Sequence, residues 1–167
     1  MDAYMAVLRI IHIIAGSFWF GASVVFAFFV EPTAKALGPQ AAPFMAHVAG
    51  KLKLPIVIAV TSIVNIIAGL LLYWRASGGL ESEWVKSAQG TAFTIGGLAA
   101  MVAWVIGFTV SRPTIDKMNA VGQRLAAGDA TAGPEMAVLA HRMRLAGRIG
   151  VALLVVATGA MAGARYF

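Results

Sequence analysis

The stretch Val30-Glu31-Pro32-Thr33-Ala34-Lys35 decides the fold, because a variant of it occurs again as Ser111-Arg112-Pro113-Thr114-Ile115-Asp116. Pro113 follows Pro32 by 81 residues. Further along, Ala46-His47 recurs as Ala140-His141 and Ala68-Gly69 as Ala162-Gly163, both at an offset of 94. Each copy is an apolar helix, a charged Pro-Thr turn, a polar amphipathic stretch and a second apolar helix. This internal repeat predicts two tandem helical hairpins, residues 4–75 and 88–167, in a single membrane domain.

Four apolar runs support an all-α integral membrane protein. The chain is 60% hydrophobic and 12% charged, with a mean hydropathy of +0.83. A bilayer core is spanned by about 20 apolar residues, and only a helix satisfies its own backbone there. The predicted transmembrane helices are Ile10 to Val30, Leu54 to Trp74, Ala88 to Val110 and Ile149 to Gly163. The expected architecture is a four-transmembrane-helix bundle.

The basic residues predict the orientation of this bundle in the bacterial cytoplasmic (inner) membrane. The first helix lacks a basic leader and a small-residue cleavage site, so we expect it to remain in the mature protein. Cytoplasmic loops carry the excess of Lys and Arg. The side with the two Pro-Thr turns holds nine bases, and the side with both termini holds four: Arg9, Arg75, Lys86 and Arg165. The turns are therefore predicted to be cytoplasmic and both termini periplasmic.

Composition also excludes several classes of function. The net charge of +6 is spread over the helix flanks, which is typical of a topology signal and not of a nucleic-acid-binding surface. Cysteine is absent, so disulfides, thiolate metal sites and cysteine nucleophiles are excluded. The sequence contains no phosphate-binding loop and no zinc-protease or serine-hydrolase motif. No carboxylate lies within an apolar run, which disfavours intramembrane acid–base hydrolysis.

The two turns differ in their charges and in their length. Glu31 and Lys35 lie four residues apart, as do Arg112 and Asp116, so each pair could form an i,i+4 contact. The reversed order also permits Glu31 to pair with Arg112 across a pseudo-twofold axis. The change of offset from 81 to 94 leaves 13 additional residues in the second copy. We expect this insert, approximately Val121 to Pro134, to be a surface loop.

His12 is the strongest candidate for chemistry. It lies about 12 Å inward from Tyr4 at the helical rise of 1.5 Å per residue. An ionisable residue at that depth usually faces the bundle interior and has a function. Counting inward from the same side brings Asn65 to its depth on the second helix. The alternatives are a cofactor ligand, a neutral histidine hydrogen-bonded to a neighbouring helix, and a proton-transfer group.

Two kinds of ligand fit His12. Haem b would take the imidazole as an axial ligand, with Arg9 paired to a propionate and Trp19 among the apolar walls. Copper in its cuprous form would combine the imidazole with a thioether, from Met101 or Met161. Methionine is also a common apolar filler, which favours a packing role over a ligand role for each of the two.

His47 and His141 occupy equivalent positions in the repeat. Two histidines at equal depth could ligate a haem from both sides or bridge a metal. Both precede their apolar runs and have basic neighbours, which favours solvated histidines outside the hydrocarbon core.

The first half of the chain resembles a family of small membrane proteins. His12-Ile13-Ile14-Ala15-Gly16-Ser17-Phe18-Trp19-Phe20-Gly21 and the later Phe29-Val30-Glu31-Pro32 are similar to the opening of CopD-type copper-resistance proteins and HemJ-type protoporphyrinogen oxidases. The resemblance covers approximately residues 8–75. It implies an integral membrane protein linked to haem or copper, with His12 matching the first-helix histidine that is associated with haem b in the HemJ type.

These observations predict a haem-b-binding membrane redox protein, with a quinone or a porphyrin as its reaction partner. A copper-handling membrane protein is the second hypothesis. The third is a non-catalytic accessory subunit of a larger membrane complex. The expected protein partners are a further copy of the chain, in a homo-oligomer, or other subunits of such a complex. Under this third hypothesis His12 is a buried polar contact.

Overall fold

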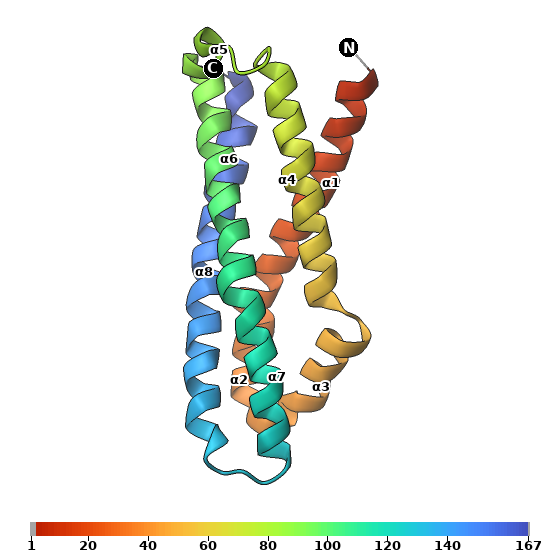
Figure 1. Ribbon diagram of the computed structural model, residues 1–167, viewed down its shortest axis with the longest axis vertical. Helices are drawn as coiled ribbons and strands as arrows, with labels where there is room; N and C mark the ends of the chain where they lie inside the picture. The colour runs from red at the N-terminus through yellow and green to blue at the C-terminus, as the bar shows by residue number, and fades with distance from the viewer. Residues whose placement is uncertain (1–2, 167) are drawn as a thin grey trace.

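A computed structural model describes residues 3–166, and all secondary structure in that range is helical (Figure 1). The long helices are α1 (Ala3–Val25), α4 (Leu54–Ala76), α6 (Ala88–Ile106), α7 (Arg112–Ala126) and α8 (Ala132–Gly163). Short helices connect them: α2 (Glu31–Leu37), α3 (Ala42–Ala46) and α5 (Ser82–Lys86). Two 3-10 turns, Gly38–Ala41 and Ala164–Tyr166, complete the chain together with three π-helical segments: Phe26–Val30, His47–Lys51 and Gly107–Ser111.

Four helical stretches are long and apolar enough to cross a membrane, as the sequence predicted. They are Ala3–Lys51, Leu54–Ala76, Ala88–Ala126 and Ala132–Tyr166. The two ends of the described chain and α5 lie at one end of the bundle, and the two Pro-Thr turns lie at the other (Figure 1). Large side chains such as Ile13, Ile14 and Leu98 are more than 60% exposed. In a membrane-spanning bundle this apolar exterior is the surface that meets lipid.

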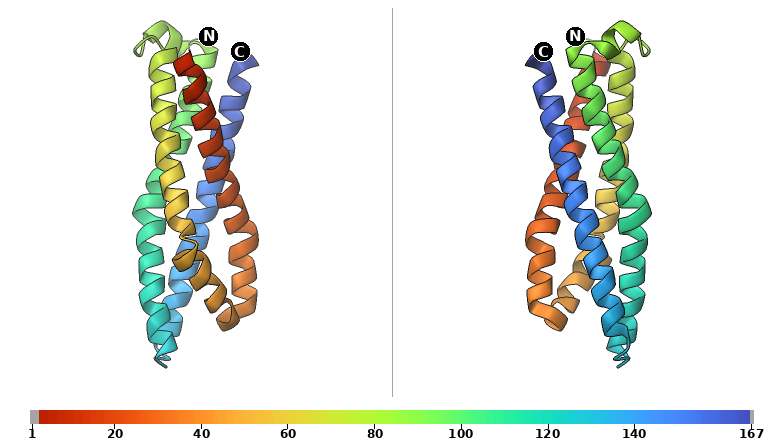
Figure 2. Two further views of the ribbon diagram at one scale, coloured as in Figure 1. Left: turned by 90° about the vertical axis from the view of Figure 1, so that its right-hand side faces the viewer. Right: turned by 90° about the vertical axis from the view of Figure 1, so that its left-hand side faces the viewer.

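The tightest helix packing is between α1 and α4 and between α6 and α8 (Figure 2). The main core joins these pairs: Trp19 of α1 is 6% exposed and packs against small residues of α6 and α8. The small residues are Ala99, Ala100, Ala103 and Ala157, and Leu154 completes the cluster. Small residues let helix backbones approach closely, which is how membrane helices gain contact area.

Both Pro-Thr turns continue the preceding helix through a widened turn. The N–H of Glu31 donates to the carbonyl of Phe26, and the N–H of Arg112 donates to that of Gly107, five residues back in each case. Proline has no N–H and its ring crowds the carbonyl four residues earlier. A π-type turn just before Pro32 and Pro113 accommodates that defect without ending the helix.

The insert of the second copy is not a surface loop, so that prediction was wrong. Val121 lies on α7 and is 3% exposed, and Ala132 begins α8 with no exposed surface. Both pack with Leu139, so the additional residues lengthen a hairpin between α7 and α8. Only residues 127–131 connect the two helices. In this connection the Asp129 carboxylate accepts hydrogen bonds from the Thr131 hydroxyl and from Arg124. These hydrogen bonds lower the pKa of Asp129, and the bond from Thr131 has the larger effect.

The predicted ion pairs of the turns were also wrong. Neither i,i+4 pair is among the ion pairs found within residues 3–166, nor is a pair between Glu31 and Arg112. Glu31 accepts a hydrogen bond instead from Nε of Arg144 on α8, at 2.9 Å. The side chains of this pair are only 16% and 24% exposed. It therefore ties the first turn to the last helix.

Candidate functional site

His12 lies on the inward stripe of α1. The most buried residues of that helix are Leu8, Ala15 and Trp19, and His12 falls between the first two at helical spacing. Steps of three and four residues repeat along one face of a helix, so the stripe points toward α4 and the core. The position of His12 on the apolar helix α1 and inside the bundle therefore follows from the spacing of its neighbours.

The imidazole of His12 is fixed by the backbone of α4. Its Nδ1 lies 2.9 Å from the carbonyl oxygen of Asn65, the central residue of Leu54–Ala76. A carbonyl can only accept, so Nδ1 carries the proton, and in the neutral ring Nε2 presents a lone pair. A histidine that ligates a metal through one ring nitrogen commonly donates from the other to a carbonyl. His12 is thus held in the tautomer that suits such a ligand.

Two glycines make room for these polar groups. A Cβ on Gly69 would lie 2.9 Å from Cε1 of His12, and a Cβ on Gly16 would lie 2.7 Å from Oδ1 of Asn65. Contacts that short do not occur for real Cβ atoms. Gly69 therefore admits the imidazole against α4, and Gly16 admits the Asn65 side chain against α1.

The Asn65 side chain is 7% exposed, and its Oδ1 has no hydrogen-bond partner among the described residues. A buried acceptor without a donor costs about 1–3 kcal/mol, so such atoms commonly mark a ligand or a bound water. Oδ1 of Asn65 is therefore an acceptor next to His12 for a hydrogen bond from an O–H or N–H group. The pair His12 and Asn65 forms the polar part of an otherwise apolar helix seam.

The remaining predicted site residues are dispersed. Arg9 is exposed on α1, one turn from His12, whereas Trp19 belongs to the core cluster with α6 and α8. Met161 packs against Gly96 of α6, where a Cβ would lie 2.9 Å from its Cγ, and Met101 is half-buried on α6. His47 and His141 are both exposed, in keeping with solvated side chains. Within residues 3–166 no three His, Asp or Glu side chains are grouped to hold a metal ion.

Sequence reasoning missed the packing roles of Gly16 and Gly69, and it missed an aromatic cluster near α5. Tyr73 of α4 hydrogen-bonds Thr94 of α6 at 2.6 Å and meets the ring of Trp84 edge to face. Trp84 in turn stacks on Phe93. The Ala-Gly repeat marked Gly69 as special, but a repeat does not say which side chain a glycine admits.

A glycine substitution tests the His12 contact. Gly69→Ala should destabilise the protein by about 1–3 kcal/mol, since the new methyl group overpacks the imidazole and strains its bond to Asn65. Gly97→Ala is the matched control, because a Cβ there meets nothing within 4 Å. Alanine is the better helix former, so this control should be neutral or slightly stabilising. Thermal unfolding in detergent measures both, and equal effects of the two changes would contradict the packing role of Gly69.

Comparison with protein-family models, with curated proteins and with solved structures found no match to this chain. The resemblance of residues 8–75 to the CopD and HemJ types therefore stays a prediction.

Proposed function

We propose that this chain is an integral membrane redox protein that binds haem b, with Nε2 of His12 as an axial ligand. One observation carries the proposal: Nδ1 of His12 donates to the Asn65 carbonyl at 2.9 Å, at the centre of a helix able to cross the membrane. That hydrogen bond leaves Nε2 as the ring nitrogen that would ligate the iron. It also fixes the plane of the ring.

The residues around His12 fit one axial ligand of a haem. Arg9 lies one turn nearer the end of α1, where a guanidinium suits a propionate carboxylate. The unpartnered Oδ1 of Asn65 supplies an acceptor beside the imidazole. His12 does not line either of the two apolar grooves described below, so the proposal rests on the imidazole and its partner. Bound haem would supply one-electron chemistry, and a quinone or a porphyrin is the class of reaction partner that this chemistry suits.

A copper-handling protein is the alternative, and the contact of Met161 counts against it. Cuprous ion would need an imidazole together with thioether donors. Met161 packs against Gly96 in the α6–α8 pair, whereas His12 packs against Gly69 in the α1–α4 pair. An accessory subunit without a cofactor is the other alternative, in which the His12–Asn65 bond only joins two helices.

We further propose two tandem hairpins related by an internal repeat, in the bacterial inner membrane with both termini periplasmic. The π-helical segments support the repeat, because Phe26–Val30 and Gly107–Ser111 lie at the same offset of 81 as the two prolines. The nine-to-four distribution of Lys and Arg supports the orientation. A reporter enzyme fused after Phe167 should be active in the periplasm; cytoplasmic activity would reverse the orientation.

A UV-visible spectrum tests the haem proposal directly. The full chain, produced with a haem precursor and purified in detergent, should show a Soret band and α and β bands that sharpen on reduction with dithionite. Haem measured by a pyridine assay should approach one per chain. A flat spectrum from protein with full helical content would overturn the proposal, and copper titration and capture of partner subunits would then separate the two alternatives.

A further inference from the structure

The two Pro-Thr turns have different surroundings, although their sequences are similar. Thr114 in the second turn is 2% exposed, and α7 packs along α8 beside it. Thr33, its equivalent in the first turn, is exposed. The first turn has no long helix to match α7, because Pro39 and Pro43 divide the polar stretch into short pieces. The first turn is thus exposed, whereas the second turn is covered by helix packing.

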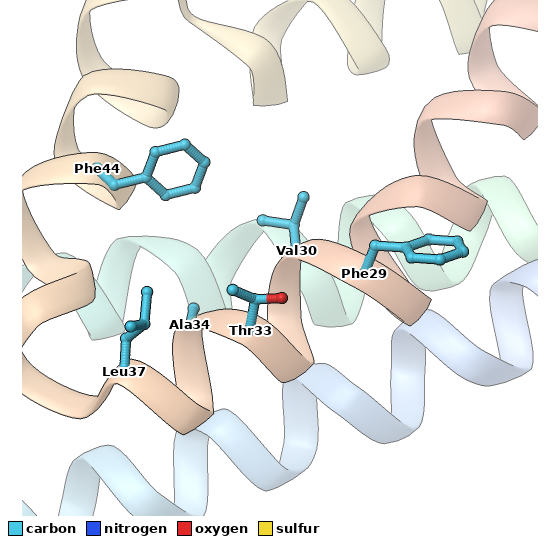
Figure 3. A pocket seen from close by; sticks show the side chains of 6 residues that line it. All are labelled: Phe29, Val30, Thr33, Ala34, Leu37 and Phe44. Atoms are coloured by element: carbon cyan, nitrogen blue, oxygen red, sulfur yellow. The ribbon is translucent and has the colours of Figure 1, made fainter.

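An apolar groove of about 230 Å³ occupies this open turn (Figure 3). Phe44 extends from α3 over a row of side chains from the preceding π-helical segment and α2 (Figure 3). The lining residues are Phe29, Val30, Thr33, Ala34, Leu37 and Phe44. Phe29 and Phe44 are more than half exposed, so the groove is open at its rim. The lining offers one hydroxyl and no charge, which suits a hydrocarbon chain.

The groove continues along α1 into the membrane-spanning part of the protein. A second groove, of about 430 Å³, shares Val30 with the first and is lined by Ser17, Gly21 and Val25 of α1 and by Leu54 of α4. From Ser17 to Leu37 the helical path covers about 30 Å at 1.5 Å per residue. The hydrocarbon core of a bilayer is about 30 Å thick and one leaflet is about half of that, so this path is long enough for one acyl chain.

The segment that forms the outer wall of the groove is basic. Residues 32–53 contain three lysines and no Asp or Glu. Lys35 follows the groove residue Ala34, and Lys51 and Lys53 precede the groove residue Leu54; all three lysines are exposed. The neighbouring Glu31 is paired with Arg144 and does not neutralise them. At the far end of α7, by contrast, Arg124 is paired with Asp129 and Glu135.

We propose that the first turn is a binding site for an anionic phospholipid. One acyl chain lies in the apolar groove, and the headgroup phosphate is held by Lys35, Lys51 and Lys53. Basic residues beside a bilayer surface attract anionic lipid, and each raises the affinity about fivefold. The apolar lining explains why a chain is bound, and the lysines explain why an anionic headgroup is preferred. This site is separate from His12 and does not depend on the proposed haem.

The test is native mass spectrometry of the full chain from micelles that contain equal amounts of phosphatidylglycerol and phosphatidylcholine with identical acyl chains. We expect one phosphatidylglycerol to be retained in clear preference. The double variant Lys35→Gln/Lys51→Gln should lower this preference about tenfold or more. The control Lys86→Gln/Lys117→Gln removes two exposed lysines elsewhere and should keep the preference.

A groove-filling variant tests the acyl-chain site. Ala34→Trp should abolish retention of both lipids, whereas Ala152→Trp, on an exposed position of α8, should leave retention unchanged. Circular dichroism checks that both variants keep their helical content. Equal retention of the two lipids by the unaltered protein would overturn the proposal, as would full retention by Ala34→Trp. Release of the lipid by millimolar inorganic phosphate alone would also overturn it, since a phosphate site without an acyl chain would then explain the charge preference.

Discussion

Replacing His12 by alanine should remove the haem spectrum of the purified protein. Removing a residue that only hydrogen-bonds a metal ligand lowers metal affinity about 10–100-fold. Removing the ligand itself should therefore lower the amount of bound haem by more than about tenfold. Addition of free imidazole should restore part of the Soret and α bands, because the vacated space between α1 and Gly69 admits the ring. The measurement is haem per chain and the reduced-minus-oxidised spectrum, with and without imidazole.

Two comparisons separate a ligand from a structural contact. His47→Ala and His141→Ala remove exposed histidines and should keep the haem content of the unaltered protein. If His12 only joins α1 to α4, His12→Ala should lower stability without changing the spectrum, and imidazole should not act on the haem. Loss of haem in His47→Ala or His141→Ala, with His12→Ala unaffected, would move the ligand to the turns and contradict the proposed site.

The membrane spans could be predicted because they depend on a length and a composition that are local in sequence. A run of about 20 apolar residues has few other folded states available to it, and each predicted run is a helix here. Equal counting from one side of the bilayer brought Asn65 to the depth of His12, and the structure joins the two residues. The contact uses the backbone carbonyl of Asn65 and not its side-chain amide. Every residue has a backbone carbonyl, so the type of residue at position 65 does not predict this contact.

Contacts between distant segments were not predictable in the same way. The partner of Glu31 lies 113 residues away in the sequence, on a helix whose rotation depends on how all the other helices pack. Local spacing suggested Lys35 as the partner of Glu31, and the repeat suggested Arg112. The insert was misjudged because its Gly and Asp residues are typical of loops, whereas the buried Val121 and Ala132 show that tertiary packing decided the helix ends.

Removing either partner of the Glu31–Arg144 pair should lower stability more than removing other charges at the turns. The two side chains are largely buried and 2.9 Å apart, so Glu31→Gln leaves a guanidinium with little solvent and no counter-ion. Breaking a fully buried pair costs about 3–5 kcal/mol; with this partial exposure we expect about 1–3 kcal/mol. Arg144→Gln should have a similar effect, measured as the free energy of unfolding in detergent.

The charge-swapped variant Glu31→Arg/Arg144→Glu distinguishes pairing from a general effect of charge. Because the pair joins the first turn to α8, the swap should recover part of the lost stability, with a coupling of about 1 kcal/mol or more in the double-mutant cycle. Lys35→Gln and Arg142→Gln are the controls, since both residues are exposed near the pair, and each should change stability by less than about 0.5 kcal/mol. Two results would contradict this pairing: stability changes of the two substitutions that simply add, or a loss of stability in Lys35→Gln equal to that in Glu31→Gln. The Glu31–Arg144 pair would then not link the two halves of the bundle.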